Sequence, residues 1–227
     1  SFTLNLNGHK LESNGLGIIH NGTGKLTING GGGKIIVHSG SSIVVDAGSL
    51  TVNEVTIISN NYCGISLTSP QSDCSLTVID CDVIGEWIGI YAESPGTMTI
   101  SGGSVSHTDM SLMNNAAIVI KRGQLNISGC EITGLQGLFG RPGSGANPTI
   151  NISGGTIIRA QLSAIWDCDV IISGPVTLQA NLVGSNFSIL TNGTLTLQRV
   201  LVARASNHSD GTLPDDPYDA ERLTKYQ

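Results

Sequence analysis

Short phrases repeat along almost the whole chain, and this recurrence constrains the possible fold more than any other feature. One copy is Thr97–Val105, TMTISGGSV, in which Met98 and Ile100 alternate with polar residues before two glycines. Such alternation is typical of a β-strand with one apolar face, and a glycine pair is typical of a tight turn. Further copies begin 20 to 27 residues apart, and their leading apolar residues are Leu4, Leu26, Leu50, Leu76, Leu125, Ile150, Val170 and Leu195.

A second phrase recurs in phase with the first, for example GIIHNG at 17–22 and GIYAESPG at 89–96. A period of 20–30 residues, with short strands and Gly, Ser and Asn at the corners, indicates a β-solenoid. We therefore predict an all-β chain in which residues 1–205 form a single right-handed parallel β-helix of about nine rungs. Longer loops are expected at 60–73, 107–115 and 141–147, and the polar segment 206–227 is expected to be a tail that serves as a cap or a linker.

The repeat resembles, over about residues 1–205, the right-handed parallel β-helix proteins of the pectin-lyase-like class. It is most similar to the LTISGG-type repeat regions of secreted, cell-surface and phage proteins. The resemblance implies an extracellular location, on a cell or virion surface. It also implies one of two functions, a non-catalytic structural or adhesive module or a polysaccharide lyase or glycoside hydrolase. The NTD–DD–GHG–RIK series of polygalacturonases does not occur in this sequence, which favours the non-catalytic function.

The charge pattern disfavours nucleic acid as a partner. The formal net charge is −6, and the basic residues are scattered singly, so the sequence offers no surface that could follow a phosphate backbone. No apolar run approaches 18 residues, so no membrane insertion is expected. No cofactor is predicted, and the expected partners are the chain itself, through end-to-end or lateral assembly, or surface glycans.

A polar column is predicted on the outer side of the first strands. Its members are Thr27, Thr51, Thr77, Thr99, Asn126, Asn151 and Thr196, with Ile171 as an exception. Stacked Thr and Asn side chains stabilise neighbouring strands by packing and hydrogen bonding. A flat threonine array can also order water as on an ice surface, but Lys25, Gln124 and Ile171 interrupt this one.

The second phrase predicts an apolar column on the outside of the coil. If Ile18, Ile90 and their equivalents point inward, the next residue in each copy points outward. These outward residues are Ile19, Val44, Ser66, Tyr91, Val119, Phe139, Trp166 and Leu190. Exposed apolar patches of this extent usually mark a contact surface.

Three interpretations of this column remain open. A neighbouring subunit or chain segment covers it, its aromatic rings stack on sugars, or the phase is wrong and the residues are internal. Asp167 weakens the chosen phase, because it would follow Trp166 on the inner side. The residues predicted to bind a ligand or form an interface are Tyr91, Val119, Phe139 and Trp166.

Carboxylates offer one alternative site. Glu54 and Asp80 hold the same turn position on adjacent rungs, and Asp82 follows two residues later. Three such groups can bind Ca²⁺, the cation used by the lyases that the repeat resembles. They can equally be solvated corner residues, so neither a catalytic residue nor a metal ligand is predicted.

Cysteines and histidines are expected to be structural. The five cysteines are an odd number, and Cys63 and Cys74 flank one loop and could pair. Cys81 and Cys130 hold the same repeat position two rungs apart, about 10 Å, which is beyond disulfide reach. The alternative is that the cysteines are small buried or corner residues. The histidines (His9, His20, His38, His107 and His208) show no ligand spacing and are expected at the surface or in corners.

Overall fold

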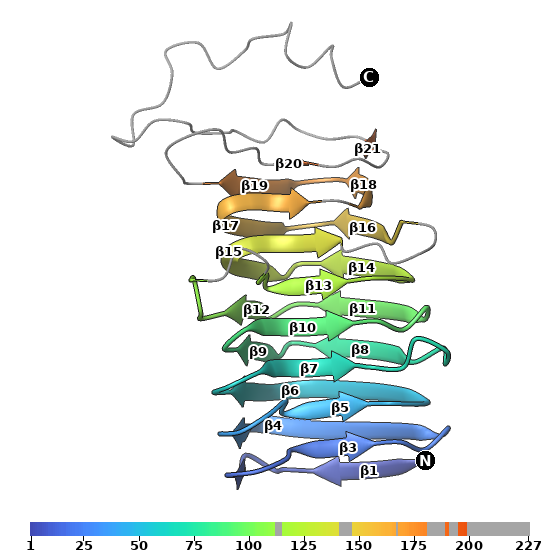
Figure 1. The fold of residues 1–227 in the computed structure, drawn as a ribbon, viewed down its shortest axis with the longest axis vertical. Helices are drawn as coiled ribbons and strands as arrows, with labels where there is room; N and C mark the ends of the chain where they lie inside the picture. The colour runs from blue at the N-terminus through green and yellow to red at the C-terminus, as the bar shows by residue number, and fades with distance from the viewer. Residues whose placement is uncertain (112–114, 141–146, 167, 181–188, 191–194, 199–227) are drawn as a thin grey trace, which may run out of the picture.

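The chain folds as a parallel β-solenoid of about seven turns (Figure 1). The structure, a computed structural model, describes residues 1–111, 115–140, 147–166, 168–180, 189–190 and 195–198. These residues form strands and turns without a helix, and the strands that pair among them are parallel. The predicted fold class is confirmed. The prediction of about nine rungs was approximate, and the structure has about seven turns. The predicted tail 206–227, its boundary with the β-helix and the loop segment 141–146 lie outside the described residues.

Three ladders of strands wrap around one core, and we name them the first, second and third sheets in chain order. Four long strands bend around a corner and belong to two sheets each: β4 (Lys25–Val37) and β6 (Ser49–Ser59) to the first and second, β15 (Glu131–Gly140) and β17 (Thr156–Trp166) to the second and third. The first sheet also contains β1 (Phe2–Asn5), β8 (Ser75–Ile79), β11 (Thr97–Ser101), β14 (Gln124–Ser128), β16 (Thr149–Ser153), β18 (Asp169–Ser173) and β21 (Leu195–Gln198).

The other two sheets use the shorter strands between these. The second sheet adds β2 (Lys10–Ser13), β9 (Asp82–Gly85), β12 (Ser104–His107) and β19 (Val176–Ala180). The third sheet adds β3 (Ile18–His20), β5 (Ile43–Val45), β7 (Cys63–Leu67), β10 (Ile88–Ala92), β13 (Ile118–Ile120) and β20 (Ile189–Leu190). In Figure 1 the strands β7, β10 and β13 of the third sheet lie at the front of the molecule.

Two sequence predictions about single segments are wrong. Phe2, not Leu4, lies opposite Leu26, so the first copy of the repeat is shifted by two residues. Both registers keep the same side chains facing inward, because the side-chain period of a strand is two. Part of the loop expected at 60–73 is strand β7, whose residues pair with β5 and β10.

The polar column on the first sheet is confirmed by the strand register. Thr27, Thr51, Thr77 and Thr99 lie opposite one another in turn, followed by Asn126 and Asn151. The amide Nδ2 of Asn151 donates to Oδ1 of Asn126 at 2.8 Å. A second asparagine ladder, which the sequence did not suggest, runs through Asn5, Asn29 and Asn53, also with hydrogen bonds of 2.8 Å. These side-chain ladders connect turns that are more than 20 residues apart in the chain.

The corner between the first and second sheets requires a left-handed backbone conformation. Glycines supply it on several turns, for example Gly102 with φ of +70° and Gly129 with φ of +61°. Glu54 and Asp80 adopt the same conformation with φ of 48° and 49°. A residue with a Cβ is strained there, so these two corners cost stability that glycine would not.

The corner between the second and third sheets requires small side chains on the inner side. A Cβ on Gly64 would lie 2.6 Å from Cγ1 of Val83, and a Cβ on Gly89 would lie 2.7 Å from Cγ1 of Val105. A Cβ on Gly137 would lie 2.4 Å from Cγ2 of Ile158. This crowding explains why the second phrase of the repeat begins with a small residue, which is glycine, alanine or serine.

Candidate functional site

The third sheet brings the predicted outer residues together on one face. The inward isoleucines of the second phrase stack as predicted: Ile65 pairs with Ile90, and Ile90 pairs with Ile118, all fully buried. The residues after them therefore form a continuous outer column. In this column Tyr91 lies opposite Val119, which lies opposite Phe139, which lies opposite Trp166. Asp167, which the phase left in question, lies outside the described residues.

The four predicted site residues differ in how much they expose. Val119 is fully buried and Phe139 is 7% exposed, whereas Tyr91 and Trp166 are partly exposed. They form a hydrophobic cluster, separate from the core, together with Ala116. The rings of Phe139 and Trp166 stack with centroids 5.1 Å apart. A partner on this face would therefore touch the flanks of the cluster rather than its centre.

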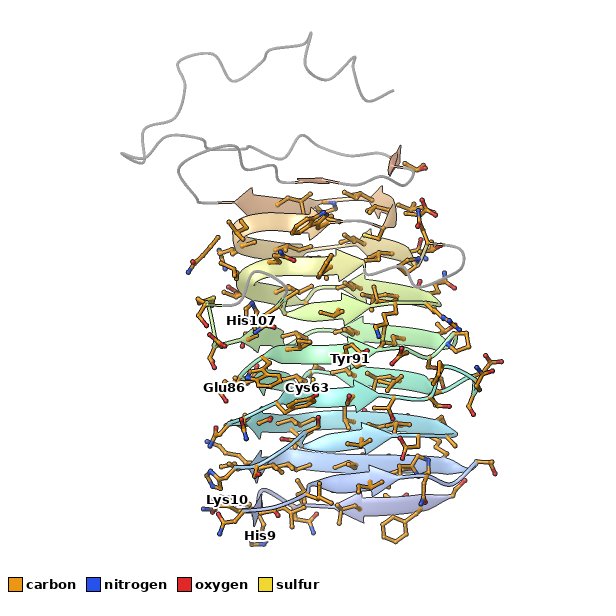
Figure 2. All side chains as sticks on the ribbon, viewed as in Figure 1. His9, Lys10, Cys63, Glu86, Tyr91 and His107 are labelled. Atoms are coloured by element: carbon orange, nitrogen blue, oxygen red, sulfur yellow. The ribbon has the colours of Figure 1, made fainter. Side chains whose placement is uncertain are left out.

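Polar groups adjoin the Tyr91 end of the cluster (Figure 2). The Tyr91 hydroxyl donates to Oε2 of Glu93 at 3.1 Å, and Nζ of Lys121 donates to Oε1 of the same carboxylate at 2.8 Å. The Lys121 ammonium also lies 5.3 Å from the centroid of the Tyr91 ring, which is a cation–π distance. The three side chains thus hold one another in place on adjacent turns.

Their protonation states follow from these contacts. The hydrogen bond from Lys121 is the main cause that lowers the pKa of Glu93. Burial acts to lower the pKa of Lys121, but its hydrogen bonds with Glu93 and Tyr91 outweigh this effect and the pKa is raised. Burial raises the pKa of Tyr91, so its hydroxyl keeps its proton as a donor. The cluster presents a carboxylate and an ammonium beside a phenol at neutral pH.

The carboxylates considered for calcium take up different structural positions. Glu54 and Asp80 form the strained corners described above, and Asp82 lies on the second sheet, where its Oδ1 accepts a hydrogen bond of 2.7 Å from Ser104. A Cβ on Gly102 would lie 1.9 Å from Oδ1 of Asp80, so this carboxylate lies over the next corner of the coil. Within the described part of the chain, no group of three or more His, Cys, Asp or Glu side chains could hold a metal ion.

The five cysteines are buried, as one of the two interpretations predicted. Cys63 and Cys74, which flank a loop, are not paired in the structure. Burial raises the pKa of Cys63 and of Cys130 to about 12. Thiols that stay protonated are poor nucleophiles, so these side chains act as small core residues. Cys81 and Cys130 hold equivalent corner positions with Gly103 between them, as the sequence predicted. The Ser104 amide donates to the Cys81 carbonyl, and the Glu131 amide donates to the Gly103 carbonyl, so the three corners follow one another along the coil.

One histidine departs from the expectation that histidines lie at the surface or in corners. His107, at the end of β12, is only 2% exposed, and its Nε2 accepts a hydrogen bond of 2.8 Å from the Leu135 amide. Gly134 leaves room for the ring, because a Cβ there would lie 2.3 Å from Cδ2 of His107. Burial lowers the pKa of His107, although the Asp109 backbone and charge oppose this shift. The spacing in the sequence gave no sign of this burial.

Sequence reasoning also missed an exposed aromatic pair at the corner between the second and third sheets. Tyr62 and Trp87 are 45% and 37% exposed, and their ring centroids lie 4.7 Å apart. Each residue stands two positions before the small residue that opens the second phrase, Gly64 or Gly89. This equal offset in two successive copies was the signal that could have revealed the pair.

Comparison with known protein families, with curated proteins and with solved structures finds no match for this chain. The parallel β-solenoid is therefore established by the structure itself. Among the described residues there is no helix with the length and apolar character needed to cross a membrane.

Proposed function

We propose that this chain is a non-catalytic structural or adhesive β-helix of the pectin-lyase-like kind, and that the outer face of its third sheet binds a partner outside the cell. The observation that carries the proposal is the outer column of the third sheet, in which Ile19 is exposed, and Tyr91 and Trp166 are partly exposed beside a buried apolar cluster. A parallel β-helix already buries its apolar side chains inside, so an apolar cluster outside has no role in closing the core.

A second copy of the same chain is the proposed partner. Two β-sheets pack face to face when each presents apolar side chains, and the column on the third sheet is apolar or aromatic at Ile19, Val44, Tyr91, Val119, Phe139 and Trp166, with Ser66 as the polar exception. Ile19, 48% exposed, extends the column at the N-terminal end, and Trp166 is partly exposed near its other end. Contact along this column would bury both.

Substitutions at the two ends of the column test the proposal. We expect Trp166→Asp and Ile19→Asp each to shift the chain from assembled species to monomers, because a charge buried between apolar faces is costly. The measurement is the solution mass by light scattering, with circular dichroism to establish that the variants remain folded.

Thr133→Asp is the matched control, since Thr133 is exposed on the second sheet. It should assemble like the wild type. Folded Trp166→Asp and Ile19→Asp variants that both assemble normally would show that the third sheet is not the interface.

A further inference from the structure

Hydrogen bonds fix the backbone that carries the Tyr62 and Trp87 rings. The Trp87 amide donates to the Tyr62 carbonyl at 3.1 Å, and the Tyr62 amide donates to Oγ of Ser59 at 2.9 Å. Oγ of Ser59, a buried group, in turn donates to the Gly40 carbonyl at 2.7 Å. Three successive corners are thereby linked, so the two rings are presented from a fixed backbone.

The pair is open on the side of the earlier turns. The residues two positions before the small residue of the second phrase are Gly15 and Gly40 on the first two turns, followed by Tyr62 and then Trp87. The two glycines place no side chain beside the Tyr62 ring. The rings meet at 42°, so they form a shallow angled surface and not a closed stack.

Hydrogen-bonding side chains precede both rings in the chain, and those that carry charge are acidic. Asn60 and Asn61 precede Tyr62 and are exposed, and Glu86 precedes Trp87 at the edge labelled in Figure 2. On the next turn the Asp109 amide donates to the Glu86 carbonyl at 2.8 Å, which places a second carboxylate at this corner. The corner segments 59–64, 85–89 and 107–111 contain no lysine or arginine.

We propose that this corner binds a neutral saccharide, with the Tyr62 and Trp87 rings against the apolar face of a sugar ring. A pyranose carries C–H groups on its faces and hydroxyls around its rim, so it matches aromatic rings bordered by carboxylates and amides. The absence of lysine and arginine from the three corner segments, with two carboxylates present, disfavours an acidic saccharide. A protein partner is disfavoured because two rings on a convex corner offer far less than the roughly 800 Å² that a stable interface buries on each side.

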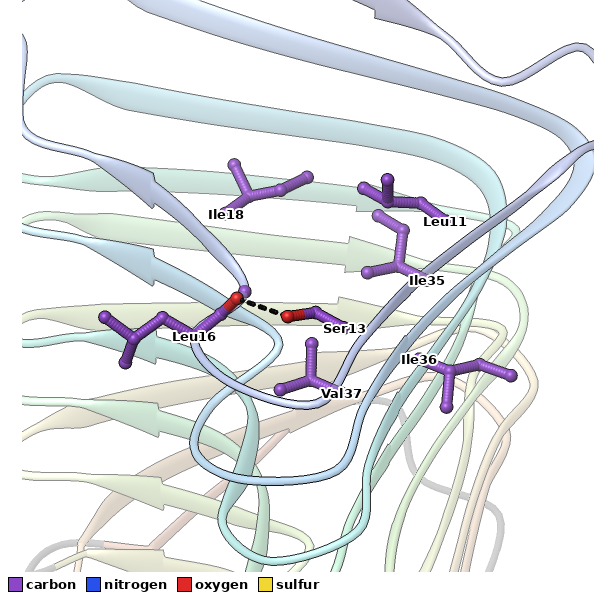
Figure 3. Close-up of a pocket in the computed structure, with 8 residues that line it drawn as sticks. Leu11, Ser13, Leu16, Ile18, Ile35, Ile36 and Val37 are labelled. Atoms are coloured by element: carbon purple, nitrogen blue, oxygen red, sulfur yellow. Dashed lines mark hydrogen bonds between the residues drawn. The ribbon is translucent and has the colours of Figure 1, made fainter.

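Tyr62 and Trp87 are not members of the third-sheet column, although Ile88 beside Trp87 packs against its cluster, so different variants test the two proposals and they can fail independently. Met110, 37% exposed, follows Asp109 on the turn after Trp87 and gives a longer oligosaccharide a further apolar contact. Leu16, 70% exposed, lies two turns before Tyr62, at the pocket drawn in Figure 3. The proposed ligand is therefore an oligosaccharide that crosses several turns of the coil.

The test uses the fluorescence of Trp87. The chain has two tryptophans, so a Trp166→Phe background leaves Trp87 as the sole tryptophan reporter. The probes are hexasaccharides of β-1,4-linked glucose, mannose and N-acetylglucosamine, with hexagalacturonate as the acidic comparison. We expect a saturable change in Trp87 fluorescence with at least one neutral probe, and no change with hexagalacturonate at the same concentration.

Tyr62→Ala should weaken the binding of that neutral probe by about tenfold or more, because an aromatic contact residue commonly carries much of the binding energy. Phe2→Ala, which removes a 65% exposed ring elsewhere, is the matched control and should leave binding unchanged. The proposal is overturned if no neutral probe binds, if hexagalacturonate binds as tightly, or if folded Tyr62→Ala binds like the parent. It is also overturned if Tyr62→Ala lowers the solution mass, since the pair would then be a protein contact.

Discussion

Individual corner residues carry strain that glycine would relieve. Glu54 adopts φ of 48° at a position where Gly102 and Gly129 stand on later turns. We expect Glu54→Gly to raise the free energy of unfolding by about 1 kcal/mol, because it removes the left-handed penalty of a Cβ. Urea unfolding of the variant and the wild type measures the difference.

Glu54→Ala separates this explanation from an effect of charge. Alanine keeps the Cβ and removes the carboxylate, so it should leave the strain in place and stability nearly unchanged. If alanine stabilises as much as glycine, repulsion of the carboxylate, and not backbone strain, is the cause.

His107 should make stability depend on pH below neutrality. Its pKa in the folded chain is lowered by burial, so the unfolded chain takes up a proton first as the pH falls below the usual histidine value of about 6.5. The free energy of unfolding should therefore fall as the pH drops through the usual histidine pKa and toward the lowered pKa of the folded chain. His107→Gln, whose amide oxygen can still accept from the Leu135 amide, should flatten that slope. An equal slope in both proteins would mean that His107 takes no part.

At the scale of strands and corners, side-chain size is constrained where the second and third sheets meet. Gly89→Ala places a Cβ 2.7 Å from the Ala117 carbonyl oxygen and from Cγ1 of Val105. We expect a loss of about 1–3 kcal/mol in the free energy of unfolding, because neither neighbour can move without disturbing a strand. Thermal and urea unfolding measure it.

Gly15→Ala is the control for this corner, since a Cβ at Gly15 meets nothing within 4 Å. It should change stability by no more than about 1 kcal/mol, in the stabilising direction. Equal losses in both variants would show that the effect comes from glycine itself and not from the crowded corner.

Strand alternation predicted which side chains face inward but not how the outside is packed. The columns through Ile90 and Thr99 could be predicted residue by residue, since a period of two distinguishes the two faces of a strand. The same period could not separate Phe2 from Leu4 as the partner of Leu26, because both face the same way. The sequence did not reveal the second sheet as a separate sheet, because its strands follow those of the first sheet directly through a corner.

The candidate site was predicted only in part, for a related reason. The sequence placed Tyr91, Val119, Phe139 and Trp166 in one outer column, and the strand register has them there. It could not show that Val119 and Phe139 are covered by their neighbours, because the column joins residues that are 20 or more positions apart. The contact between the Tyr62 and Trp87 rings depends in the same way on how successive turns stack.

At the scale of the whole molecule, the described chain is a stiff coil with a continuous core and two candidate contact surfaces. The third-sheet cluster supports the proposed assembly, and the Tyr62–Trp87 corner supports the proposed saccharide binding. Because the surfaces lie on different parts of the coil, a chain that assembles through the sheet can keep the corner accessible. An assembled adhesive would then present many corners at once and gain from multivalent binding.

The mass of the wild-type chain in solution, measured by light scattering over a concentration series, tests the proposed assembly most directly. If the chain assembles through its third sheet, we expect the mass to rise with concentration from the 23.5 kDa of one chain to that of a dimer or larger assembly. A mass of one chain at every concentration would contradict it.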